Sequence, residues 1–192
     1  MTSVNDRELL YFATADQFES WLEKNLDHDG VRLQLRKKNS TLPGIRYAEA
    51  LDVALCWGWI DGQAGSLDEN FYTVGFSPRR ARSLWSQINR DHVARLTLEG
   101  RMQAPGQAEV DRAKADGRWD AAYSQKNATV PADLQLALDA NPAALAVFAR
   151  LSAQNRWAIL FRIGNVKRAE TRAAKIATFV SMLERGELPY PQ

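Results

Sequence analysis

Hydrophobic and polar residues follow two different periods along the chain, and the changes of period mark its elements. After Thr14, apolar residues recur three and four positions apart, which predicts a helix that ends before Gly30. Residues 31–38 alternate at every position instead, so they predict a strand with one face toward water. Residues 46–57 return to the helical period, and Gly58 ends that helix.

The following segment predicts two more strands and then a helical half. Strands are expected at 59–66 and 71–77, with 67–70 as the turn between them. From Pro78 onward the pattern is helical, and Ser83 is expected to cap the first helix of this half. The later helices are expected to begin at Pro105, Pro131, Pro142, Ser152 and Lys167.

These elements predict an α+β protein. A small three-stranded antiparallel sheet with N-terminal helices, at about 14–77, is expected to pack against a helical C-terminal half at about 78–186. The 192 residues contain no internal repeat, no low-complexity run and no long linker, so residues 1–192 are expected to form a single domain.

Composition and charge narrow the class of protein. Hydrophobic residues make up 45% and charged residues 25%, as in folded globular proteins. The net charge of +2 gives no general attraction for nucleic acid or anionic membranes. The single cysteine, Cys56, cannot form an internal disulfide, the N-terminus does not resemble an export signal, and no run approaches the ~18 apolar residues of a membrane span. The cytoplasm is therefore the expected compartment.

Motifs for metals and cofactors are not found in the sequence. Cys56, His28 and His92 are isolated from one another, so no metal site is expected. No glycine-rich phosphate loop occurs, and no cofactor is expected. Because no pattern places a base beside it, Cys56 is expected to be a buried, inert thiol.

The most informative chemistry lies in the predicted hairpin. If its strands pair evenly around the turn, Asp61 lies opposite Phe76 and Gln63 lies opposite Val74. Asp61 then belongs to a largely apolar face, where a carboxylate requires a cation or several hydrogen-bond donors.

Two arginines follow the end of the same strand and leave two interpretations open. In the first, Asp61 pairs with Arg79 or Arg80 and locks the sheet to the helices. In the second, a spare guanidinium and nearby tryptophans line a concave pocket for a small anionic or planar ligand. Trp85 is the tryptophan most expected to leave the core for this pocket. The residues predicted for the ligand site are Trp59, Asp61, Arg79, Arg80, Ser83, Trp85, Ser86 and Asn89.

Five segments, in order and in register, resemble the YdeI/OmpD-associated (bacteriocin-protection) family from about residue 10 to residue 185. The resemblance implies protection against bacteriocins or antimicrobial peptides and an association with the outer-membrane porin OmpD. It carries over no catalytic residues and no defined reaction. The segments are CWGWIDG (56–62), FSPRRARSLWSQIN (76–89), LEGRM (98–102), ADGRWDAAY (115–123) and AETRAAKI (169–176).

Three functions stay open at this point. The first, favoured by the resemblance and not requiring an enzyme, is a stress or antimicrobial-peptide tolerance factor that binds a small anionic ligand or a protein partner. The second is an enzyme that uses Asp61 as a general acid or base. The third is a nucleic-acid-binding regulator that uses a basic stripe of the last helix, formed by Arg168, Arg172 and Lys175. Nucleic acid is the least expected partner, because no aromatic side chains lie between these cations.

Overall fold

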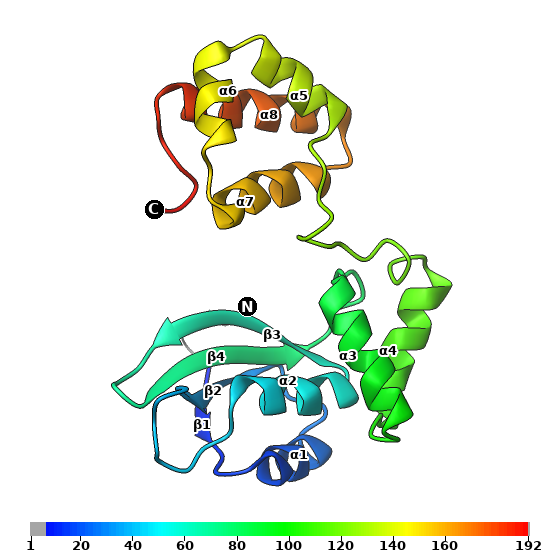
Figure 1. Ribbon diagram of the computed structural model, residues 1–192. Helices are drawn as coiled ribbons and strands as arrows, with labels where there is room; N and C mark the ends of the chain where they lie inside the picture. Colours follow the sequence, from blue (N-terminus) through cyan, green and yellow to red (C-terminus); the bar gives the residue numbers. More distant parts are fainter. Residues whose placement is uncertain (1–6, 192) are drawn as a thin grey trace. The chain divides into compact units, whose positions relative to one another are not determined.

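The computed structural model describes residues 7–191, and the chain divides into two compact units, Met1–Tyr123 and Ser124–Gln192. The first unit combines helices with a sheet, and the described part of the second consists of helices and their connections (Figure 1). The expectation of a single domain over residues 1–192 stays a prediction. If the prediction holds, the full chain should unfold in one cooperative transition when it is heated in a calorimeter.

A four-stranded mixed sheet forms the centre of the first unit, with strand order β1-β2-β4-β3. β1 runs parallel to β2, while the β2–β4 and β3–β4 pairs are antiparallel. The α+β class is confirmed, but the three-stranded antiparallel sheet was wrong by one strand. The missed strand has three residues, too few to show an alternating pattern. The strands are β1 (Leu9–Tyr11), β2 (Val31–Arg36), β3 (Trp59–Ser66) and β4 (Phe71–Pro78).

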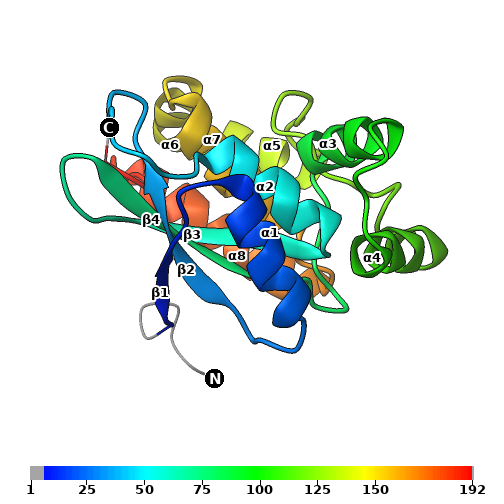
Figure 2. The ribbon, with the colours of Figure 1, turned by 90° about the horizontal axis from the view of Figure 1, so that it is seen from below.

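Helices α1 (Ala15–Lys24) and α2 (Tyr47–Cys56) cover one face of this sheet (Figure 2). The alternation of β2 explains why, since its apolar residues face the helices and are fully buried, whereas Arg32 and Gln34 between them are only partly buried. The apolar residues of β2 in this core are Val31, Leu33 and Leu35.

Two further helices, α3 (Gln87–Leu98) and α4 (Ala104–Ala115), pack against α2. The start of α4 lies very close to the end of α2, because Gly106 has no side chain; a methyl group there would overlap the carbonyl oxygen of Cys56. The cap predicted at Ser83 was wrong. Ser86 caps α3 instead, since its Oγ accepts a hydrogen bond from the backbone N–H of Asn89 at 3.1 Å.

Four helices surround the core of the second unit. They are α5 (Ala132–Asp139), α6 (Pro142–Ala149), α7 (Ala153–Gly164) and α8 (Ala169–Glu184). The segment after α8 returns to α7, where buried Asn155 makes two hydrogen bonds, of 3.1 and 2.9 Å, with the backbone of Tyr190. Across residues 7–191, none of the helices has the length and apolar content that crossing a bilayer requires.

Candidate functional site

The register of the β3–β4 hairpin places the candidate acid. Asp61 lies opposite Phe76, as predicted. The expected pairing of Gln63 with Val74 was wrong, because the register shifts between Asp61 and Ala64 and Ala64 takes the position opposite Val74. Such a bulge bends a strand and cannot be recognised from an alternating pattern. Asp61 therefore keeps its predicted place at the start of the hairpin.

The expected ion pair between Asp61 and an arginine is not formed. Among residues 7–191, Asp61 has no ion pair with Arg79 or Arg80; it accepts a hydrogen bond from the Tyr47 hydroxyl at 2.9 Å. Burial, followed by the charge of Asp61 and this hydrogen bond, raises the pKa of Tyr47 far above its usual range. Tyr47 thus stays protonated and donates to the carboxylate.

Arg79 is buried without an anionic partner. Arg79 is only 5% exposed, and its Nη1 donates a hydrogen bond to the Leu84 carbonyl oxygen at 3.2 Å. Within the described part of the chain, its Nε and Nη2 have no hydrogen-bond partner. Burial lowers the pKa of Arg79 to about 10, although nearby Glu109 partly offsets this effect, so the group stays charged at neutral pH.

Trp85 forms a stack with this guanidinium. The Arg79 Cζ lies 3.5 Å from the centroid of the Trp85 ring, and Trp119 meets Trp85 edge to face at 4.9 Å. The expectation that Trp85 leaves the core was wrong, because it is only 2% exposed. Its indole N–H, like the Nε and Nη2 of Arg79, finds no acceptor in residues 7–191. One stack therefore holds three buried donors that lack acceptors.

The other residues predicted for the site have structural roles. Trp59 is 1% exposed and belongs to the core under α2. Arg80 is exposed, and its backbone N–H donates to the Ser83 Oγ at 2.9 Å in the loop before Trp85. Ser86 and Asn89 form the cap of α3. Of the predicted site residues, Asp61, Arg79 and Trp85 stay candidates for ligand binding, and a concave pocket around them stays a prediction.

Two tyrosines that the sequence reasoning missed adjoin this region. Tyr47 reaches Asp61 from the first residue of α2, and Tyr123 pairs with Ser86 through a short parallel bridge. The Tyr123 backbone N–H also donates to the Trp85 carbonyl oxygen at 3.0 Å. Tyr123 lies outside the regular elements, so no periodic pattern singles it out, and Tyr47 fits the helical pattern as an ordinary apolar residue.

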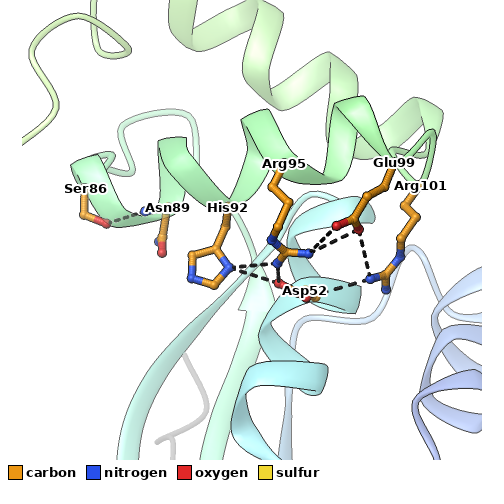
Figure 3. A network of polar contacts seen from close by, with 7 residues as sticks. All are labelled: Asp52, Ser86, Asn89, His92, Arg95, Glu99 and Arg101. Carbon is orange, nitrogen blue, oxygen red and sulfur yellow. Dashed lines mark hydrogen bonds and ion pairs between the residues drawn. The ribbon is translucent and has the colours of Figure 1, made fainter.

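A second polar cluster joins α2 to α3 (Figure 3). Asp52 accepts a hydrogen bond from Arg95 Nη2 at 2.6 Å, and its Oδ1 lies 3.0 Å from His92 Nδ1. Glu99 pairs with Arg95 at 3.1 Å and with Arg101 at 3.7 Å, and Arg101 lies 3.8 Å from Asp52. Burial pushes the pKa of Asp52 upward, but the hydrogen bonds from Arg95 and His92 outweigh it and hold the pKa below 3.8. Each charge of this Asp52 cluster has an opposite charge beside it.

The structure confirms part of the interpretation of Cys56. The residue is 1% exposed, and burial raises the pKa of its thiol to about 11. The thiol is therefore protonated at neutral pH and a weak nucleophile. Within residues 7–191, no group of three or more His, Cys, Asp or Glu side chains is placed to hold a metal ion.

Two hollows in the surface are not lined by Arg79. One, of about 410 Å³, follows α1. The other, of about 530 Å³, lies between α5 and α8, and its lining is mainly alanine, Ile176 and Val180. At its edge Arg172 binds both carboxylate oxygens of Asp133, at 2.6 and 2.9 Å. The central cation of the predicted basic stripe is therefore neutralised.

Two family models match the chain in separate regions. Residues 10–109, just over half of the chain, match the model described as "Domain of unknown function (DUF8412)". Residues 127–186 match the model described as "Bacteriocin-protection, YdeI or OmpD-Associated". No curated protein and no solved structure matches.

The second match confirms the resemblance seen in the sequence, for the region that it covers. Of the five segments, the one at 169–176 lies inside it. Those at 56–62, 76–89 and 98–102 lie within the other match, and 115–123 lies between the two.

Proposed function

The chain belongs, through residues 10–109, to the family described as "Domain of unknown function (DUF8412)", and we propose a binding role for that region. Its first unit binds a small oxyanion, a carboxylate or phosphate group, at Arg79 and Trp85. The observation that supports this role most strongly is the buried guanidinium of Arg79, whose Nε and Nη2 have no hydrogen-bond partner among residues 7–191.

The chemistry of the donors fits an oxyanion. Nε and Nη2 are the two nitrogens on one side of a guanidinium, and their parallel N–H bonds match two oxygens of a carboxylate or phosphate. A buried cation and a buried indole N–H without acceptors both cost free energy in the ligand-free protein. An oxyanion that reaches all three donors from the edge of the stack satisfies them, so binding recovers that cost.

The alternatives have weaker support. An enzyme that uses Asp61 requires a substrate group in reach of that carboxylate, and among residues 7–191 the one hydrogen-bond partner of Asp61 is Tyr47. A nucleic-acid-binding role for the last helix loses its central cation, because Arg172 is paired with Asp133. A binding role requires neither a reactive thiol nor a bound metal.

The proposed cellular role is tolerance to stress or to antimicrobial peptides in the cytoplasm. It is supported by the match of residues 127–186 to the bacteriocin-protection family. We expect a bacterial culture that expresses the parent chain to survive a bacteriocin better than one that expresses Arg79→Met. Equal survival of the two cultures would show that tolerance does not depend on the anion site.

Thermal unfolding tests the binding role directly. Sodium phosphate, sulfate and propionate are each added at constant ionic strength, with chloride as the reference anion. Because a ligand stabilises the native state that it binds, a concentration ten times Kd adds about 1.4 kcal/mol and raises the Tm.

The matched variants are Arg79→Met and Arg80→Met, which remove neighbouring arginines, one buried and one exposed. We expect the parent and Arg80→Met to respond to at least one oxyanion and Arg79→Met to lose the response. An equal response from Arg79→Met, or no response of the parent to any oxyanion, contradicts the proposal.

A further inference from the structure

Asp61 lies at the same end of the β3–β4 hairpin as Arg79, and the two charges do not pair. We infer that the oxyanion bound at Arg79 belongs to a zwitterionic molecule of the amino-acid type, whose ammonium group binds Asp61. This inference rests on the proposed function and names the class of ligand.

The backbone places both side chains in one region. The Arg79 N–H donates to the Gly58 carbonyl oxygen at 2.9 Å, and Asp61 lies three residues along the neighbouring strand. Tyr47 of α2 reaches Asp61, while Tyr123 runs beside Trp85 and Ser86. The chain thus converges on this end of the hairpin from α2, from the loop before α3 and from the segment around Tyr123.

Both charges act on this region without neutralising each other. Asp61 and Arg79 shift the pKa of Tyr123 in opposite directions, while burial is the largest effect and raises it. The distance between Asp61 and Arg79 nevertheless exceeds that of an ion pair. In the described chain, Asp61 receives one hydrogen bond, from Tyr47, and no cation contacts it.

A zwitterion complements this arrangement better than a simple anion does. Its oxyanion satisfies the Nε and Nη2 of Arg79, and its ammonium group satisfies Asp61, so no net charge is added beside the buried guanidinium. Phenol rings also suit ammonium groups, and Tyr72 and Tyr123 both lie within electrostatic range of Tyr47. A doubly negative ligand, by contrast, would be repelled by Asp61.

Matched probes separate this inference from the proposed function. Propionate carries only the carboxylate, β-alanine adds an ammonium group to the same carbon chain, and ethylammonium carries only the cation; glycine and acetate repeat the comparison with a shorter spacing. Affinities are measured by tryptophan fluorescence at constant ionic strength and pH 7. We expect one of the two amino acids to bind the parent at least tenfold more tightly than its carboxylate.

The variants are Asp61→Asn, Arg79→Met and, as a control, Glu69→Gln, which alters an exposed acid at the turn of the same hairpin. Asp61→Asn should reduce the ratio of affinities to about one, Arg79→Met should remove the binding of all probes, and Glu69→Gln should keep the ratio. If the parent binds the carboxylates as tightly as the amino acids, or if Asp61→Asn keeps the preference, the zwitterion inference is overturned and the oxyanion site stands. If no carboxylate-bearing probe binds, the zwitterion inference is overturned; if phosphate and sulfate also fail to raise the Tm of the parent, the oxyanion site is overturned with it.

Discussion

The Asp52 cluster and the Arg79–Trp85 stack both adjoin α3, yet they treat buried charge in opposite ways. In the Asp52 cluster, two carboxylates meet two arginines and a histidine, and hydrogen bonds and ion pairs link them all. In the stack, one deeply buried guanidinium has an aromatic ring beside it, and no carboxylate of residues 7–191 lies within ion-pair distance of it.

The difference separates a structural network from a binding site. A network whose charges satisfy one another stabilises the fold, and removing one member leaves the others unpaired. A buried cation without an anion costs stability in the ligand-free protein, and the binding of an anion offsets that cost. The comparison therefore predicts opposite effects of mutation in the two regions.

The largest effect is expected from Asp52→Asn. The substitution leaves Arg95, His92 and Arg101 without their shared acid, so the free energy of unfolding should fall by about 2 kcal/mol in urea denaturation. Asp116→Asn is the matched control, because Asp116 pairs with Arg118 at the surface, where solvent screens the pair, and its loss should be clearly smaller than that of Asp52→Asn. Equal losses of unfolding free energy in the two variants would show that the Asp52 cluster stabilises the fold no more than a surface ion pair does.

The same cluster should give the stability a dependence on acid. The pKa of Asp52 is lowered in the folded protein, so its stabilisation is present above the ordinary value of 3.8 and is lost as the pH falls through the folded-state pKa. The difference in unfolding free energy between the parent and Asp52→Asn should therefore be constant near pH 7 and shrink below about pH 4. A difference that is unchanged at pH 3 would contradict this assignment.

Arg79→Met should have a smaller effect of opposite sign. Methionine fills a similar volume beside Trp85 and removes an unpaired buried charge, while one hydrogen bond to Leu84 is lost. We expect the ligand-free variant to be more stable than the parent by about 1 kcal/mol in urea denaturation. A loss of more than about 2 kcal/mol would mean that the guanidinium supports the fold rather than a ligand.

The smallest effect is expected from Tyr47→Phe. The change removes the hydrogen bond to Asp61 at a partly exposed position, which should lower the free energy of unfolding by about 0.5 kcal/mol. Tyr11→Phe, which removes an exposed hydroxyl bonded to the Pro43 carbonyl oxygen at 3.0 Å, is a control from the other edge of the sheet. A loss above about 2 kcal/mol in Tyr47→Phe would place this tyrosine in the structural class with Asp52.

The fold could be predicted where one period extends over many residues. The β2 alternation and the helical repeat of α2 gave elements close to those observed, and the pairing of Asp61 with Phe76 followed from an even hairpin. Short or irregular features could not be predicted. β1 has too few residues for a period, and the shift between Asp61 and Ala64 breaks the even count.

The sequence could indicate which residues belong to the candidate site better than how they are arranged in space. Asp61 and Arg79 were singled out because charge beside an apolar strand requires a partner, but sequence spacing could not show that they remain apart. Trp85 was expected outside the core because polar residues flank it, whereas its stacking on Arg79 is a tertiary contact. The contribution of Tyr123 depends on a bridge to Ser86 across distant parts of the sequence.

The indole N–H of Trp85 tests the central claim most directly, because it is one of the three donors assigned to the oxyanion. Its ¹H–¹⁵N signal, identified by its loss in Trp85→Phe, can be followed while β-alanine is added at constant ionic strength, with propionate as a second titrant. The account predicts a saturable downfield shift of this signal in the parent and none in Arg79→Met. An unmoved Trp85 signal, or an equal shift in Arg79→Met, would contradict it.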